Sequence, residues 1–264
     1  MRVERLPFTV YDIVGYFVPG FLLLIGLAHL VPEVLPTFTK HVSLLVAASP
    51  ESVGGTKAGT EFEHVTGSFA RQAITITFVI AVAYALGHII SLLAGRIIEW
   101  LVIKKFFGYP SQYLIDNPNF KRRRYHPAAL PKLAQKRLSE RFEKEFGAKL
   151  SPDDTWEWFS LIDYYLRSHN PPIAARMYNY VVLYGFLRNT AFVFLLLGIV
   201  AFRYAVGCRP NVTWLIPGSF FILMAFSMAG FQKYFRRYST EALMAFAVGE
   251  PDESEDDKIN RINS

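Results

Sequence analysis

The sequence has little of what enzymes and metal proteins use. Its 264 residues contain one cysteine, Cys208, which excludes an intrachain disulfide framework and a metal site built from several thiolates. Its six histidines are scattered, and none pairs with cysteine, aspartate or glutamate at metal-ligand spacing. No serine lies in a nucleophile elbow. We therefore predict no catalytic residue, no metal site and no cofactor.

Charged residues are scarce over four long stretches, and no acidic residue lies deep in any of them. Of all residues, 52% are hydrophobic, which is high for a soluble protein of this length. A helix of about 20 apolar residues crosses a hydrocarbon core about 30 Å thick and satisfies its own backbone hydrogen bonds there. The sequence therefore predicts an all-α integral membrane protein with four transmembrane helices, over residues 12–31, 73–95, 189–207 and 213–231.

The first stretch has an alternative interpretation as a cleaved signal peptide, with Arg2 and Arg5 as its basic start. Asp12, Pro19 and Gly20 interrupt its apolar core, and its cleavage site would be a poor one. We therefore expect a retained helix. Pro19 is expected to kink that helix near its cytoplasmic end, either as a packing notch or as a hinge beside a pore.

The positive charges are distributed unevenly around the four stretches. If the chain crosses the membrane four times, 23 of its 28 lysine and arginine residues fall on one side. The positive-inside rule places that side in the cytoplasm, together with both termini and the long basic segment between the second and third helices. Arg71, Arg203 and Arg209 then lie at outer ends of the helices, and Arg188 lies near an inner end.

This topology divides the chain into four parts. The first is a transmembrane pair with an outer loop over residues 32–71. A basic helical cytoplasmic domain, inserted between the second and third helices, and a second transmembrane pair follow. The last part is a cytoplasmic tail that is acidic and disordered at its end. The predicted bounds are 1–95, 96–187, 188–237 and 238–264.

Apolar residues recur at helical spacing within the predicted cytoplasmic domain. One helix is predicted over residues 131–146, with Gly147 as its stop. A second follows residues 151–154 and ends at Asn170-Pro171-Pro172, and a third leads into the third span. The predicted core faces of the first two contain Leu133, Leu138, Phe142 and Phe146, and Trp158, Leu161, Ile162, Tyr165 and Leu166.

The second span carries a ridge of small residues. Ala83, Gly87, Ser91 and Gly95 recur at every fourth position and therefore share one helix face. Small residues let helix backbones approach closely in lipid, where no hydrophobic force drives association. The partner is either a helix of the same chain or a copy of this span in another subunit. His88 lies one position from the ridge, as a functional intramembrane imidazole or a hydrogen-bonded structural histidine.

If the protein conducts ions, the arginines at the ends of the spans indicate the sign of the ion. Rings formed by Arg71, Arg188, Arg203 and Arg209 in an oligomer would favour anions over cations. Four such apolar helices do not enclose a wet pathway by themselves, so conduction would require several chains. The candidates for a pore or gate are therefore these arginines, His88 and Pro19.

The densest polar signal is the run Lys121-Arg122-Arg123-Arg124-Tyr125-His126, which Lys104 and Lys105 extend. Four cations followed by two rings are a plausible site for phosphates and stacked bases, and so for a nucleotide or single-stranded nucleic acid. The run has two other interpretations. It holds anionic lipid and reinforces the topology, at about 1 kcal/mol per cation, or it binds a protein partner.

Two short motifs carry a resemblance. Tyr11-Asp12-x-x-Gly15-Tyr16-x-x-Pro19-Gly20, and the pair Arg188-Asn189, look like those of bacterial inner-membrane proteins found in defence islands. The overall plan is similar to the membrane effectors of anti-phage systems such as CBASS and Hailong. In those systems, a nucleotide or oligonucleotide made by a partner nucleotidyltransferase controls an oligomeric membrane protein that depolarises or permeabilises the inner membrane.

The resemblance implies a homo-oligomeric, ligand-controlled channel or pore in the bacterial inner membrane. The alternative is a non-conducting membrane anchor that recruits a soluble partner protein through its cytoplasmic domain. Stoichiometry separates the two, because a channel built from such helices must oligomerise and an anchor need not.

Overall fold

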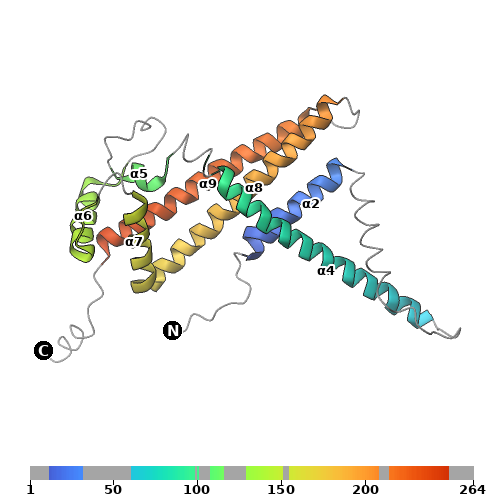
Figure 1. Cartoon of the computed structure of the whole chain (residues 1–264), viewed down its shortest axis with the longest axis horizontal. Coiled ribbons are helices and arrows are strands. Elements are labelled where there is room, and N and C mark those ends of the chain that lie inside the picture. Colours follow the sequence, from blue (N-terminus) through green and yellow to red (C-terminus); the bar gives the residue numbers. More distant parts are fainter. Residues whose placement is uncertain are drawn as a thin grey trace. The chain divides into compact units, whose positions relative to one another are not determined.

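The structure is a computed structural model that describes residues 12–31, 61–98, 100, 108–115, 129–150, 155–207 and 214–249. These residues form helices and the turns between them, without a strand (Figure 1). In chain order the helices are the π-helical turn η1 (Ile13–Phe17), α2 (Val18–Leu30), α4 (Glu61–Ala94), α5 (Pro110–Leu114), α6 (Lys132–Phe146), α7 (Thr155–His169), α8 (Pro171–Val206) and α9 (Leu215–Val248).

Four of the helical segments are long and apolar enough to cross a membrane, which confirms the four predicted spans as apolar helices. They are Ile13–Leu30, Gln72–Ile98, Pro171–Val206 and Leu215–Val248. Three continue beyond their predicted ends. Helix α4 begins at Glu61, so the last part of the predicted outer loop 32–71 is helical. Helices α8 and α9 contain 36 and 34 residues, and each contributes one segment to each of two compact units.

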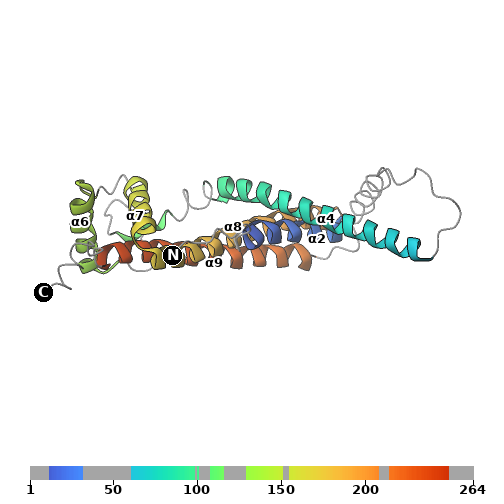
Figure 2. The ribbon, with the colours of Figure 1, turned by 90° about the horizontal axis from the view of Figure 1, so that it is seen from below.

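The chain forms two compact units. Unit 1 contains residues 1–96 and 185–229, and unit 2 contains residues 97–184 and 230–264. Helices α8 and α9 each contribute residues to both units. Within unit 1, Gly198 of α8 lies against the ring of Phe221 in α9, and within unit 2 the rings of Tyr180 and Tyr234 stack. The ribbons of α8 and α9 run side by side in both views (Figure 1 and Figure 2). The two helices therefore pair with each other in both units.

Unit 1 is held together by close contact between η1–α2 and α4. A methyl group added at Gly20 would clash with the carbonyl oxygen of Ala83, and one added at Gly87 would clash with the carbonyl oxygen of Tyr16. The backbones therefore touch, which only residues without a side chain permit. Large apolar side chains on the outer side of α4 remain exposed, including Ile76 and Leu92. This distribution is the one expected of a helix whose outer face contacts lipid or another chain.

Unit 2 is a helical domain with its own apolar core. Helix α6 stops at Gly147, whose positive φ of 68° forms the left-handed cap that ends the helix, as the sequence predicted. Asn170 separates α7 from α8, and its side-chain oxygen accepts a hydrogen bond from the amide of Ile173. The core is built by Leu114, Leu130, Leu138, Phe142, Trp158, Phe159, Ile162, Leu166, Met177, Tyr238, Ala242, Leu243, Phe246 and Ala247.

Two expectations about unit 2 differ from the structure. Leu133 and Leu161, expected on core faces, are 63% and 45% exposed, because the buried stripe of α6 runs through Ala134, Leu138 and Phe142 and that of α7 runs through Trp158, Ile162 and Leu166. The predicted tail boundary at residue 238 is also displaced. Helix α9 continues to Val248, and Tyr238, Leu243 and Phe246 are core residues of unit 2. The acidic end of the tail lies outside the described residues.

Candidate ligand pocket

Several predicted site residues fall outside the described part of the chain. These are Lys104, Lys105, the run Lys121-Arg122-Arg123-Arg124-Tyr125-His126, and Arg209. Arg71 lies in α4, but its side chain is not among those described. The remaining candidates, Pro19, Ala83, Gly87, His88, Ser91, Gly95, Arg188 and Arg203, are all in unit 1.

The small-residue ridge of α4 meets two helices of the same chain. Its first half, at Ala83 and Gly87, contacts the backbone of η1 and α2. Its second half faces α8, where the Nη2 atom of Arg188 donates to the hydroxyl of Ser91 at 3.4 Å. An added methyl group at Gly95 would lie 3.5 Å from the same guanidinium. Both halves of the ridge therefore contact helices of the same chain. The small residues of the first half let the backbone of η1 and α2 approach, and those of the second half leave space for the Arg188 side chain.

The helix is irregular before Pro19, as expected, and a side chain of another helix bonds to the backbone there. In an α-helix the carbonyl of Gly15 accepts from the amide of residue 19, and proline has no N–H to donate. The turn before Pro19 is π-helical, with the amide of Val18 bonded to the carbonyl of Ile13. Asn189 of α8 donates its side-chain amide to the Gly15 carbonyl at 2.8 Å, and this side chain is only 1% exposed. The buried asparagine therefore supplies a donor that the proline withholds.

His88 packs between two tyrosine rings. Its ring stacks on Tyr16 of η1, with centroids 4.1 Å apart, and meets the edge of Tyr84 at 4.6 Å. The histidine thus joins α4 to η1 as one element of an aromatic cluster. Arg203 lies apart from all of these, exposed in the last turn of α8. The structure brings Ser91, Gly95 and Arg188 together and leaves Arg203 separate.

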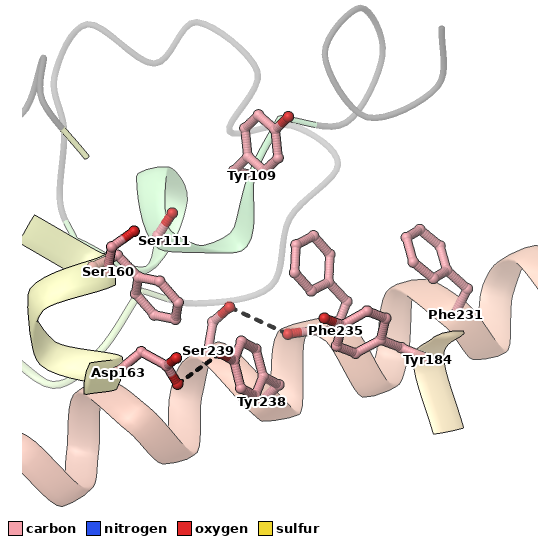
Figure 3. Close-up of a pocket in the computed structure, with 10 residues that line it drawn as sticks. Tyr109, Ser111, Ser160, Asp163, Tyr184, Phe231, Phe235, Tyr238 and Ser239 are labelled. Atoms are coloured by element: carbon pink, nitrogen blue, oxygen red, sulfur yellow. Dashed lines mark hydrogen bonds between the residues drawn. The ribbon is translucent and has the colours of Figure 1, made fainter. Parts of the chain in front are cut away.

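Unit 2 contains a pocket of about 290 Å³, large enough for a small organic molecule (Figure 3). Its walls come from α5 and the residue before it, from α7, and from the parts of α8 and α9 that belong to this unit. The described lining residues are Tyr109, Ser111, Phe159, Ser160, Asp163, Tyr184, Phe231, Phe235, Tyr238 and Ser239.

Aromatic rings form most of the pocket wall. Tyr184 of α8 is central, because its ring lies 5.1 Å from that of Phe235, 5.9 Å from that of Tyr238 and 6.1 Å from that of Phe231. Phe159 of α7 meets Tyr238 at 5.8 Å with the planes inclined by 71°. Phe231 and Phe235 stack with their planes inclined by 22°, and the other ring pairs of the wall pack edge-to-face or tilted. Figure 3 shows Tyr109 across the pocket from this wall.

One carboxylate, that of Asp163, anchors the polar side of the pocket. Its Oδ1 atom accepts from the hydroxyl of Tyr238 at 2.8 Å, and its Oδ2 atom accepts from Nε of Arg167 at 2.8 Å. Partial burial alone would lower the pKa of Arg167, but the hydrogen bond and the charge of Asp163 outweigh it, so that pKa is raised. The hydrogen bond from Tyr238 ties α9 to α7 at the pocket floor.

Two further polar contacts fix the end of α9 beside the pocket. Nη1 of Arg141, in α6, donates to the carbonyl of Phe246 at 2.9 Å and also to that of Gly249. It thereby satisfies carbonyls that the end of a helix leaves without an intrahelical donor. Arg176 of α8 pairs with Glu241 at 3.2 Å. Helix α9 is therefore held by α6, α7 and α8 together.

The pocket was not predicted from the sequence. Only two short sequence patterns indicate it. One is an aspartate and an arginine four residues apart in α7, and the other is the set of aromatic residues at positions 231, 235 and 238, near the end of the apolar part of α9. The basic residues around position 236 indicate the end of an apolar span, so the sequence does not predict that the aromatic residues beyond it line a pocket. The sequence does not predict the contact of Asn189 either, because its partner is a backbone carbonyl 174 positions away.

The chain matches no protein-family model, no curated protein and no solved structure.

Proposed function

We propose that this protein is a homo-oligomeric membrane channel or pore-type effector, controlled by a ligand that unit 2 binds. The observation that carries the proposal is the continuity of α8 and α9. Each helix contributes apolar sequence to unit 1 and lines the pocket of unit 2, α8 through Tyr184 and α9 through Phe231, Phe235, Tyr238 and Ser239. A ligand that prefers one arrangement of the pocket walls therefore acts directly on two membrane-spanning helices. It shifts the equilibrium between two conformations of these helices by the difference between its binding free energies for the two.

The orientation of the chain in the membrane follows from charge. We propose that unit 2 and both termini are cytoplasmic in a bacterial inner membrane, because most of the lysine and arginine residues lie on that side. The basic run over residues 121–124 then shares the compartment of a soluble nucleotide or nucleic acid ligand. Control by such a ligand, and a role in anti-phage defence, remain the part of the proposal that rests on the resemblance.

Conduction would require several copies of the chain. The outer face of α4 and that of α9 in unit 1 expose large apolar side chains, including Leu92 and Phe226 at 76% and 72%. Lipid or neighbouring subunits would cover these faces. The small-residue ridge is filled within the chain, so the proposed subunit contact uses these exposed faces instead.

A voltage-sensitive dye tests the proposal in bacteria that express the chain. The matched variant has Lys121, Arg122, Arg123 and Arg124 changed to alanine, and a second variant has only the exposed Lys132 and Lys136 changed. We expect depolarisation with the wild-type chain and with the second variant, and a changed response when the run is removed. Full polarisation in every strain, together with a monomeric purified protein, would contradict the channel.

The alternative function is a non-conducting anchor that recruits a soluble partner through unit 2. The observation that favours it is the use of the α4 ridge within one chain, which leaves no dedicated small-residue face for a second copy. An anchor predicts that the purified protein is monomeric and that a soluble protein co-purifies with it. Light scattering of the detergent-solubilised chain separates the two functions.

A further inference from the structure

The polar side chains that line the pocket of unit 2 carry oxygen atoms and no nitrogen atoms, among the residues that the structure describes. Among its described lining residues, every polar side-chain atom is an oxygen, from three serines, three tyrosines and Asp163, and the remaining lining side chains are phenylalanines. No lining residue in this part of the chain carries a side-chain nitrogen. The walls therefore present one carboxylate, hydroxyl groups that either accept or donate a hydrogen bond, and aromatic faces, whose quadrupoles are negative.

The rings surround the space rather than form a flat slot. The plane of Tyr184 is inclined by 49° to that of Phe235 and by 56° to that of Tyr238, and Phe159 is inclined by 71° to Tyr238. Phe231 and Phe235 are nearly parallel, with planes inclined by 22°, but their centroids lie only 5.7 Å apart. A flat ligand between two rings needs about 7 Å, which is two carbon–carbon contact distances of about 3.5 Å, so it does not fit between this pair. A compact cation is instead attracted by ring faces and carboxylates from several directions, as in aromatic cages that recognise ammonium groups.

Asp163 retains capacity for a ligand. A carboxylate offers about four acceptor positions, and Tyr238 and Arg167 use one on each oxygen. The guanidinium of Arg167 is half-exposed and is not part of the pocket wall. Arg167 therefore reaches Oδ2 of Asp163 from outside the pocket wall, and the unused acceptor positions of the carboxylate are the ones that a positively charged group in the pocket would meet.

We propose that this pocket binds a small organic cation, a primary amine or a quaternary ammonium group, with its charge among the ring faces and beside Asp163. The inference goes beyond the proposed function, because it assigns the pocket a cationic ligand that is separate from the nucleotide or nucleic acid proposed for the basic run over residues 121–124. A bound cation occupies an acceptor position that Tyr238 and Arg167 leave open, and it shares the charge of the carboxylate with them. It therefore loosens the hydrogen bond that ties α9 to α7 and biases the helix that continues into the membrane-spanning unit.

The test is calorimetric titration of the purified full-length chain with choline, with ethanolamine, and with the neutral isostere of choline in which carbon replaces nitrogen. We expect choline or ethanolamine to bind at least tenfold more tightly than the neutral isostere. This comparison uses the wild-type protein and does not depend on the folding of a variant. Failure of both amines to bind, or equal affinity for the isostere, would overturn the proposal.

Two variants locate the site. Asp163→Asn and Tyr184→Leu are each expected to lower the choline affinity about tenfold. The matched controls are Glu157→Gln and Tyr164→Leu, both at exposed positions of α7, and these should leave the affinity unchanged. Circular dichroism confirms that each variant retains its helices. Choline binding that survives both pocket variants with intact folds would place the cation elsewhere and refute the assignment.

The cation has two possible sources, a free metabolite or a lipid head group, and the surrounding lipid separates them. Titration is repeated in nanodiscs of phosphatidylglycerol alone and of phosphatidylglycerol with phosphatidylethanolamine. Competition by the second lipid assigns the pocket to a head group, and unchanged affinity assigns it to a soluble amine. Depolarisation is measured independently, so a cation site without conduction would refute the channel and leave the pocket assignment intact.

Discussion

Asn189 is the residue whose role most depends on a distant partner. Its amide reaches the Gly15 carbonyl, which lies four residues before Pro19, and almost none of its surface is exposed. A polar side chain in a membrane span is commonly taken as part of an ion path or a ligand site. The role that the structure gives this asparagine is structural, because it donates to a backbone carbonyl at a buried position, where an unpaired acceptor is costly.

At this scale we predict a coupling between Asn189 and Pro19. Asn189→Ala should destabilise the protein by about 1–2 kcal/mol, because the buried Gly15 carbonyl loses its side-chain donor. Pro19→Ala restores an amide at residue 19 that can donate to the same carbonyl. The double variant should therefore be less destabilised than the sum of the two single variants. The measurement is denaturant-induced unfolding of the purified protein in detergent, followed by circular dichroism.

The control for this cycle is Asn179→Ala, at an exposed position of the same helix α8. Its effect on the free energy of unfolding should stay within about 0.5 kcal/mol. Strict additivity of Asn189→Ala and Pro19→Ala would mean that the asparagine does not compensate for the proline.

At the scale of helices, close backbone contact positions η1 and α2 against α4. Gly20 and Gly87 face each other's helices across this contact, and neither position has room for a β-carbon. In lipid such contacts contribute through packing, because the solvent is as apolar as the side chains. The aromatic cluster of Tyr16, Tyr84 and His88 lies at the same crossing and depends on the same separation of the helices.

A matched pair of glycine substitutions tests this contact. Gly87→Ala should destabilise unit 1 by about 1–3 kcal/mol, because the added methyl group forces η1 and α4 apart. Gly218→Ala, where an added β-carbon has no neighbour within 4 Å, should change stability by less than about 1 kcal/mol and in the stabilising direction. Thermal unfolding in detergent measures both. Equal effects of the two substitutions would show that the crossing tolerates a wider separation.

At the scale of the whole molecule, the chain returns to unit 2 after it has contributed to unit 1. Residues 230–249 supply Tyr238, Leu243 and Phe246 to a core that otherwise comes from residues before 185. This closure makes the C-terminal part of α9 an obligatory element of unit 2. It also explains why Arg141 of α6 caps the end of a helix more than 100 positions away.

Two truncations test the boundary. A chain that ends at residue 249 retains every described contact and should unfold as the full-length protein does. A chain that ends at residue 237 loses Tyr238, Leu243 and Phe246 from the core, so unit 2 should lose its cooperative unfolding and become sensitive to protease. Limited proteolysis and circular dichroism of the two purified chains make the comparison. Protection of unit 2 in the shorter chain would contradict the assignment of these residues to its core.

The sequence alone determined the features that depend on local composition. The length of the apolar stretches predicted four helices, and a glycine after an amphipathic stretch predicted the end of α6. These predictions succeed because hydropathy, periodicity and helix caps depend on residues within a few helical turns of one another. The small-residue spacing gave the ridge of α4, since residues four apart share a face whatever lies opposite.

Only the tertiary structure decided what those faces meet. It placed Gly20 and Arg188 against the ridge, joined Asn189 to the Gly15 carbonyl, and assembled the pocket from rings of α7, α8 and α9 around Asp163. It also drew residues 238–248 into the core of unit 2, where composition had predicted a tail. These features depend on contacts between residues far apart in the chain. The sequence pattern of one segment does not show which other segment packs against it.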